Sequence, residues 1–222
     1  MKSSTLLAIV VALPLFFLSV ASAQNRPSTP EYDAVKDFSL ASNPNGVWSY
    51  GSLANYSAPF VLYTNASTNC INSPSSVWGY PNCITPLVQH NDTNQTECFE
   101  SICVPPNVLR LDIGNQGNGP FISVVRWTAP QAGSYLFVGG VEGLDYVDPT
   151  STDLRVIYNS SKTLLQVVVD SYEKPFIYRQ ALNLAAGDTM DFAVDMGKDR
   201  DWHFDSTGLE VTVTQVQYAE PK

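Results

Sequence analysis

Hydrophobic and polar residues alternate through much of the second half of the chain. In the clearest case Leu209, Val211 and Val213 fall on one face of an extended segment, while Glu210 and Thr212 fall on the other. Alternation with period two is typical of an antiparallel strand with one buried face. Similar runs, bounded by Gly, Pro and Asn, predict strands over residues 121–127, 135–138, 153–158, 163–169, 176–184, 188–194 and 209–216.

The first half of the chain has a weaker pattern. Residues 53–107 are rich in Asn, Ser and Pro, with short strand-like pieces at 60–63, 77–80 and 86–89. Residues 24–37 mix prolines and charges without periodicity, which predicts a flexible lead-in. The sequence therefore predicts an all-β domain over residues 38–216, an antiparallel two-sheet β-sandwich of jelly-roll type, with an irregular disulfide-stapled insertion at about 64–107 and a tail at 217–222.

The first 23 residues have the order of a secretory signal peptide. Lys2 precedes an apolar run over residues 6–20, and Ala21-Ser22-Ala23 follows it. A membrane-spanning helix needs about 20 apolar residues, and Pro14 interrupts this shorter run, so an uncleaved anchor is the less favoured interpretation. We expect cleavage after Ala23 and a secreted, extracellular protein.

Four cysteines, Cys70, Cys83, Cys98 and Cys103, lie in one stretch of the chain. An even number in an exported protein predicts two disulfides. Short loops close most easily, which favours Cys70 with Cys83 and Cys98 with Cys103, although crossed pairings stay open. Zinc is the alternative, but His90 and the wide cysteine spacing give no standard ligand pattern.

Charge and sequons add information about partners and modification. The formal net charge of −9 disfavours nucleic acid and anionic lipid as partners. Five Asn-x-Ser/Thr sequons are candidate glycosylation sites on the surface of a glycoprotein, at Asn55, Asn65, Asn91, Asn94 and Asn159.

An ordered set of motifs carries a resemblance to a known group of proteins. The set comprises NPNGVWSYG from Asn43, SVVRWTAPQAGSY from Ser123, LAAGDTMDFAV from Leu184 and DSTGL from Asp205. It resembles a domain of secreted, mostly microbial proteins that have no established activity. A looser likeness to the jelly-rolls of C1q and tumour-necrosis-factor-like domains implies architecture only, because the chain lacks their collagen-like stalk and closing aromatic strand.

An acidic segment near the C-terminus is a candidate cation site. The spacing Asp199-x-Asp201-x-His203-x-Asp205 places oxygen donors at alternate residues, as a loop around Ca²⁺ would need. The segment is not an EF-hand, because it lacks the central glycine of that motif. The alternative is a solvated loop whose aspartates bond turn amides.

Aromatic residues near loops are candidates for stacking on sugar rings. Trp48 and Trp127 fall in strands and are expected in the core. Flat amphipathic rings in loops bind ligands at low entropy cost. The candidates for ligand binding are Trp78, Tyr80, Tyr146 and Trp202.

The chain lacks the common catalytic motifs, including a Gly-x-Ser-x-Gly elbow, a His-Glu-x-x-His helix and a phosphate loop. Asp145 and Asp201 are the carboxylates considered for a glycosidase. The favoured function is a non-catalytic module that binds carbohydrate or a surface protein. The alternatives are a self-associating component of a wall or matrix, with possible homo-oligomers, and a polysaccharide-active hydrolase.

Overall fold

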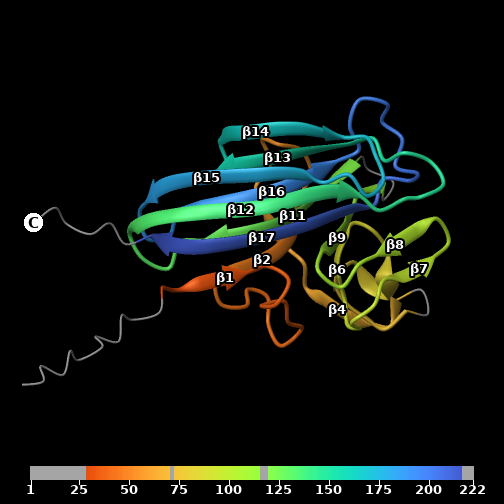
Figure 1. The fold of residues 1–222 in the computed structure, drawn as a ribbon, viewed down its shortest axis with the longest axis horizontal. Coiled ribbons are helices and arrows are strands. Elements are labelled where there is room, and N and C mark those ends of the chain that lie inside the picture. Colours follow the sequence, from red (N-terminus) through yellow and green to blue (C-terminus); the bar gives the residue numbers. More distant parts are fainter. Residues whose placement is uncertain (1–28, 71–72, 116–119, 217–222) are drawn as a thin grey trace, which may run out of the picture.

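A computed structural model describes residues 29–70, 73–115 and 120–216. The signal-peptide prediction for residues 1–23 and the tail at 217–222 lie outside the described residues. The predicted fold class is confirmed, because two antiparallel sheets face each other across a hydrophobic core (Figure 1). In the part of the chain that the structure describes, no helix has the length and apolar character to cross a membrane.

The first sheet has eight strands in the order β15-β12-β17-β9-β6-β5-β4, with β1 also pairing with β17. Its strands are β1 (Glu31–Asp33), β4 (Asn65–Thr68), β5 (Ser75–Gly79), β6 (Leu87–Asn91), β9 (Leu109–Asp112), β12 (Gly133–Gly143), β15 (Phe176–Leu184) and β17 (Thr207–Val216).

The second sheet has seven strands in the order β14-β13-β16-β11-β2-β3, with β10 pairing with β11. Its strands are β2 (Trp48–Leu53), β3 (Val61–Leu62), β10 (Gly114–Asn115), β11 (Pro120–Thr128), β13 (Thr152–Tyr158), β14 (Lys162–Val169) and β16 (Thr189–Asp195). A separate hairpin joins β7 (Glu97–Phe99) to β8 (Ile102–Val104), and a short 3-10 helix, η2, spans Pro81–Cys83.

Aromatic side chains fill the space between the sheets, as the strand pattern predicted for Trp48 and Trp127. Trp127 is 0% exposed and packs edge-on against Tyr135 and Phe137, at centroid distances of 4.9 and 5.2 Å. Trp48 is its direct partner on the neighbouring strand. The core is therefore centred on β11, β12 and β2.

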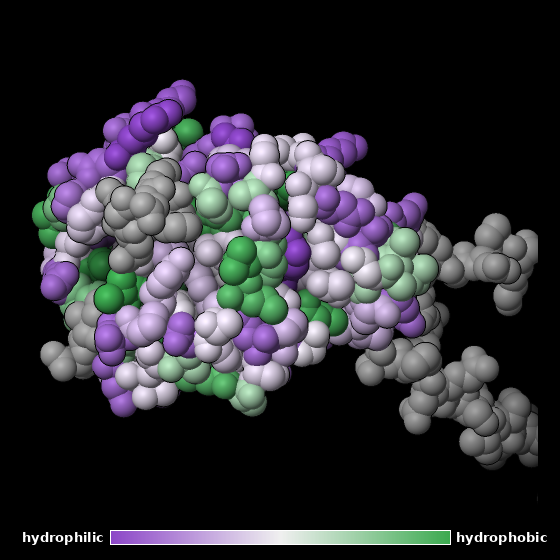
Figure 2. All heavy atoms as spheres, turned by 180° about the vertical axis from the view of Figure 1, so that it is seen from behind, coloured by the Kyte–Doolittle hydropathy of each residue, from purple (hydrophilic) through white to green (hydrophobic). Residues whose placement is uncertain are grey.

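The outer face of the second sheet carries a smaller hydrophobic cluster, formed by Leu53, Ile122, Val124, Ile157 and Ala193. The segment between β2 and β3 covers this cluster with Tyr56 and Phe60, which lie beneath arginine side chains of the sheet. Figure 2, which views the molecule from behind, shows hydrophobic residues on that side as separate patches among polar ones.

The predicted lead-in is partly wrong, since residues 31–37 belong to the fold. Tyr32 in β1 pairs with Val213 of β17, and Ala34 is completely buried. Three residues are too few to show alternation in the sequence. The strand forms because the backbone of β17 at residues 212–214 pairs with it. The fold therefore includes residues before Phe38, with its first strand beginning at Glu31.

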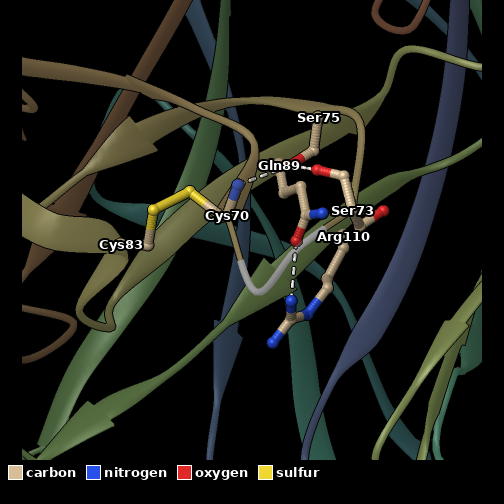
Figure 3. The surroundings of a disulfide bond; sticks show 6 residues. All are labelled: Cys70, Ser73, Ser75, Cys83, Gln89 and Arg110. Carbon is tan, nitrogen blue, oxygen red and sulfur yellow. Dashed lines mark hydrogen bonds between the residues drawn. A yellow bond between two sulfur atoms is a disulfide. The ribbon is translucent and has the colours of Figure 1, made fainter.

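The predicted insertion at 64–107 is also more regular than expected, because β4, β5 and β6 extend the eight-stranded sheet. Polar residues hide this continuity in the sequence. Ser75 and Gln89 are each 1% exposed, and Gln89 accepts a hydrogen bond from Arg110 (Figure 3). Buried polar groups that are hydrogen-bonded can occupy core positions without giving a hydrophobic signal.

Both favoured disulfides are present. Cys70 bonds to Cys83, which ties the segment after β4 to η2 (Figure 3). Cys98 bonds to Cys103 between directly paired residues of the β7–β8 hairpin, where the Cα atoms are 4.1 Å apart. Disulfides of this kind fit an oxidising compartment.

The sequons differ in accessibility. Asn55, Asn94 and Asn159 are exposed, and Asn65 is half-buried. Asn91 is 2% exposed, and its amide donates hydrogen bonds to the carbonyls of Gln95 and Val104. The prediction of a glycan on Asn91 is therefore wrong for the folded protein, since that amide nitrogen is buried and already bonded.

Candidate functional site

Three segments that are distant in sequence meet at one end of the sandwich, on the right in Figure 1. They are the β7–β8 hairpin and the connections from β12 to β13 and from β16 to β17. Backbone hydrogen bonds join them, from Cys103 N to Leu144 O at 3.0 Å and from Leu144 N to Ser206 O at 2.9 Å. The strands thus bring the loops together, and the loops bond to one another.

These segments enclose a cavity of about 270 Å³ that opens to solvent. Its lining is mixed, with carboxylates, hydroxyls and aromatic rings. The lining residues are Thr85, Glu100, Ser101, Ile102, Arg110, Asp112, Ile113, Asp145, Trp202, His203, Phe204, Asp205 and Ser206.

A buried ion pair forms one wall of the cavity. Arg110 and Asp112 lie on the same face of β9 and form a bidentate pair, from Nε to Oδ1 and from Nη2 to Oδ2. Arg110 also donates to Gln89 Oε1 at 2.6 Å and lies 4.9 Å from the centroid of the Phe99 ring. Each of the three guanidinium nitrogens therefore donates a hydrogen bond within the protein.

Two further carboxylates line the cavity, and neither forms a salt bridge with a described residue. Asp145 is 1% exposed and accepts hydrogen bonds from Ser101 Oγ at 2.7 Å and Ser206 N at 2.9 Å. Burial raises the pKa of Asp145, although these hydrogen bonds oppose the shift. An ionised carboxylate in such a place is costly unless another group compensates its charge.

Asp205 is the most perturbed acid at the site. It is 3% exposed, and its Oδ1 accepts hydrogen bonds from the Ser151 amide and hydroxyl, whereas its Oδ2 is buried without a hydrogen-bond partner. Burial raises the pKa of Asp205 to about 7, the Ser151 hydrogen bonds oppose this rise, and the charges of Asp199 and Asp145 add to it.

We expect Asp205→Asn to remove part of the pH dependence of stability. Between about pH 4 and about pH 7, Asp205 keeps its proton in the folded protein. In the unfolded chain, where its pKa has the ordinary value of 3.8, it has lost that proton. Asp205 therefore destabilises the wild type as the pH rises from about 4 to about 7, by up to about 1.4 kcal/mol per pH unit. Asparagine does not titrate, so the variant should lack this slope.

Urea unfolding of both proteins at several pH values in that range measures the effect. The other acids titrate in both proteins and cancel in the difference. Stability curves that stay parallel across the range would show that Asp205 ionises normally.

The structure places two of the four predicted aromatic residues at this end. Trp202 is 46% exposed and stacks on His203, with centroids 4.0 Å apart, at the cavity lining. Tyr146 is 51% exposed, follows Asp145 in the chain, and donates from its hydroxyl to Glu100 O at 2.7 Å. Both remain candidates for ligand contact.

The other two aromatic candidates lie elsewhere. Trp78 is 6% exposed, and its indole N–H donates to Ser39 O at 2.8 Å, so it presents no free ring face. Tyr80 is partly buried against the core and packs edge-on against Tyr63. The prediction for Trp78 is corrected because β5 is a strand of the main sheet, which turns this side chain inward.

The predicted calcium site has no matching geometry. Asp199 accepts a hydrogen bond from Ser151 Oγ, Asp201 from His203, and Asp205 from Ser151. Among the described residues no group of three or more His, Cys, Asp or Glu side chains converges to hold a metal ion. The solvated-loop interpretation fits Asp199 and Asp201, which are exposed, whereas Asp205 points inward.

The glycosidase pair is not brought together in the cavity either. Asp145 lines the cavity, but Asp201 does not. Asp201 is exposed, and hydrogen bonds from His203 lower the pKa of its carboxyl.

Several lining residues were missed by the sequence pattern. Leu109 and Leu111 face the core, so Arg110 and Asp112, which alternate with them, have the pattern of a solvent-facing side. The β7–β8 hairpin and its neighbours cover that side instead. Phe204 also lines the cavity and was missed. Its backbone has a φ of 60°, which is rare for a bulky residue and cannot be read from the residue type.

Comparison with known proteins adds little beyond the architecture. No family model and no curated protein sequence matches the chain. Among solved structures, rabbit GITRL is 12% identical, covers 43% of this chain and 74% of its own, and has a TM-score of 0.30.

Carbohydrate-binding modules are also among the similar structures. A family 35 module from Clostridium thermocellum is 14% identical, covers 65% of this chain and 100% of its own, and has a TM-score of 0.32. The C-terminal CBM6 of LamC from Zobellia galactanivorans is 14% identical, covers 48% and 90%, and has a TM-score of 0.27. At these identities and scores the likenesses support no statement about ligand or activity. The chain is a disulfide-bonded β-sandwich.

Proposed function

We propose that this protein is a secreted, non-catalytic module that binds carbohydrate in the cavity at the loop end of the sandwich. The observation that carries the proposal is Trp202, a half-exposed indole on the lining of an open, polar cavity. An amphipathic aromatic ring offers a flat surface for the apolar face of a sugar. The neighbouring carboxylates and hydroxyls offer hydrogen-bond partners for sugar hydroxyl groups.

The geometry of the cavity supports a small ligand. Its volume of about 270 Å³ lies just below the range of about 300 to 1,000 Å³ that is usual for ligand sites. Asp145 and Ser206 are fixed by hydrogen bonds between two loops. A site held in this way loses little conformational entropy when a ligand binds.

A glycan array followed by calorimetry on the strongest ligand tests the proposal. We expect Trp202→Ala to weaken binding about tenfold, because an aromatic contact contributes about 1 kcal/mol or more. Trp202→Phe keeps a ring and should retain most of the affinity. Ile177→Ala, at a 61% exposed position on β15, is a control for general surface changes.

Two outcomes would contradict the proposal. One is the absence of glycan binding by the wild type. The other is equal affinity of the wild type and Trp202→Ala. Concentration-dependent assembly without glycan binding would instead favour the self-associating structural component, and release of reducing ends from a polysaccharide would favour the hydrolase.

A further inference from the structure

The cavity is lined by more acidic than basic side chains. Its lining contains four carboxylates, Glu100, Asp112, Asp145 and Asp205, against one arginine and one histidine, Arg110 and His203. Arg110 is bonded to Asp112, and His203 Nδ1 is bonded to Asp201 Oδ1 at 2.5 Å. Within the described residues, neither Asp145 nor Asp205 forms a salt bridge.

Asp205 provides a second, independent observation, because one of its two carboxylate oxygens lacks a hydrogen-bond donor in the described part of the chain. Its side chain is 97% buried, since 3% is exposed, and its Oδ2 has no hydrogen-bond partner. Buried polar atoms without partners are uncommon because they lose hydration without compensation. The Ser151 donors lower the pKa of Asp205 and the like charges of Asp199 and Asp145 raise it, and among the described residues no cation forms a salt bridge with it.

The aromatic side chains of the cavity narrow the class of ligand. Trp202 and Phe204 lie in the lining together with the acids. An organic cation is attracted both to carboxylates and to the faces of aromatic rings. A bare metal ion fits less well, because among the described residues no group of ligating side chains converges.

We propose that the cavity binds a protonated amino sugar, with its ammonium group at Asp205 and Asp145 and its ring against Trp202. This inference rests on the proposed carbohydrate binding and specifies the sugar. An ammonium group supplies several donors and a positive charge for the acids that line the cavity, among which Asp205 has an oxygen without a partner among the described residues. The flat exposed indole at the lining fits a sugar ring better than the narrow alkyl stem of a lysine.

A matched series of β-1,4-linked hexamers of glucose, N-acetylglucosamine and glucosamine isolates the ammonium group, since they differ only at carbon 2. Calorimetry near neutral pH, where Asp205 with its pKa of about 7 is partly ionised and part of the amine is protonated, should give a dissociation constant about tenfold lower for the glucosamine hexamer than for the others. In Asp205→Asn this preference should fall to about threefold or less. The affinity for the glucose hexamer should be retained.

Glu31→Gln is the matched control, because it also removes one carboxylate but lies far from the site. Glu31 pairs with Thr214 of β17, whereas the cavity adjoins the other end of that strand, at Thr207. The Glu31→Gln variant should keep the full preference for the glucosamine hexamer. If Asp205→Asn does not fold, Asp145→Asn provides the second variant, with the same loss of preference expected.

Three results would overturn the inference. The first is an equal reduction of the preference for the glucosamine hexamer in Asp205→Asn and Glu31→Gln. This result would indicate general attraction between an acidic protein and a cationic polymer. The second is equal binding of all three hexamers, which would leave carbohydrate binding intact and refute only the ammonium specificity. The third is equally tight binding of a lysine peptide of the same charge, which would assign the cavity to protein amines.

Discussion

Replacing Arg110 with methionine is expected to lower the free energy of unfolding by about 3 to 5 kcal/mol. Arg110 and Asp112 are 3% and 6% exposed, and the guanidinium is bonded to both carboxylate oxygens. Methionine would leave the Asp112 charge buried and Gln89 Oε1 without its donor. A buried charge without a partner is among the most destabilising changes a single substitution can make.

The double variant Arg110→Met/Asp112→Leu separates the cost of an orphaned charge from the cost of lost packing. Removing both charges should restore much of the stability, since a buried ion pair contributes little relative to hydrophobic residues of similar size. Chemical denaturation of the three proteins gives the comparison. If the double variant were as unstable as the single one, packing around Phe99 rather than charge burial would dominate.

Trp127→Ala is expected to destabilise the domain by a similar amount, about 3 to 5 kcal/mol. The indole is completely buried between the sheets and packs against Tyr135 and Phe137. Its removal would leave a large cavity that strands on both sides cannot fill, because both are fixed in their ladders.

Trp202→Ala is the matched control, because it makes the same substitution at a 46% exposed residue. We expect it to change the free energy of unfolding by about 0.5 kcal/mol or less. Thermal or denaturant unfolding measures both variants. A small effect of Trp127→Ala would contradict the assignment of the core to the β11, β12 and β2 region.

The sequence predicted the hydrophobic half of the fold well and the polar half less well. Alternation identified β17, whose Leu209, Val211 and Val213 face the core. It gave only a short strand-like piece at 86–89 for β6, because Gln89 and Asn91 are buried and hydrogen-bonded. A period-two pattern reports burial only where buried residues are apolar.

Prediction of the site was limited by long-range contacts. Trp202 and Tyr146 were identified by residue type, and the fold brings both to the same end of the sandwich. Arg110 and Asp112 were missed because their side of β9 is covered by a hairpin about ten residues away in the chain, which local pattern does not reveal. The two disulfides were predicted because short loops restrict the possible pairings.

The most direct test of the account is a nuclear magnetic resonance titration of the isotope-labelled protein with the glycan that binds best. Binding in the cavity should give chemical-shift changes at the Trp202 indole N–H and at amides of residues 100–102, 144–146 and 203–206. A second groove, of about 500 Å³, is lined by Val138, Ile177 and Thr212 on the outer face of the first sheet. Shifts confined to that groove, with Trp202 unchanged, would show that the glycan does not bind in the cavity at the loop end of the sandwich.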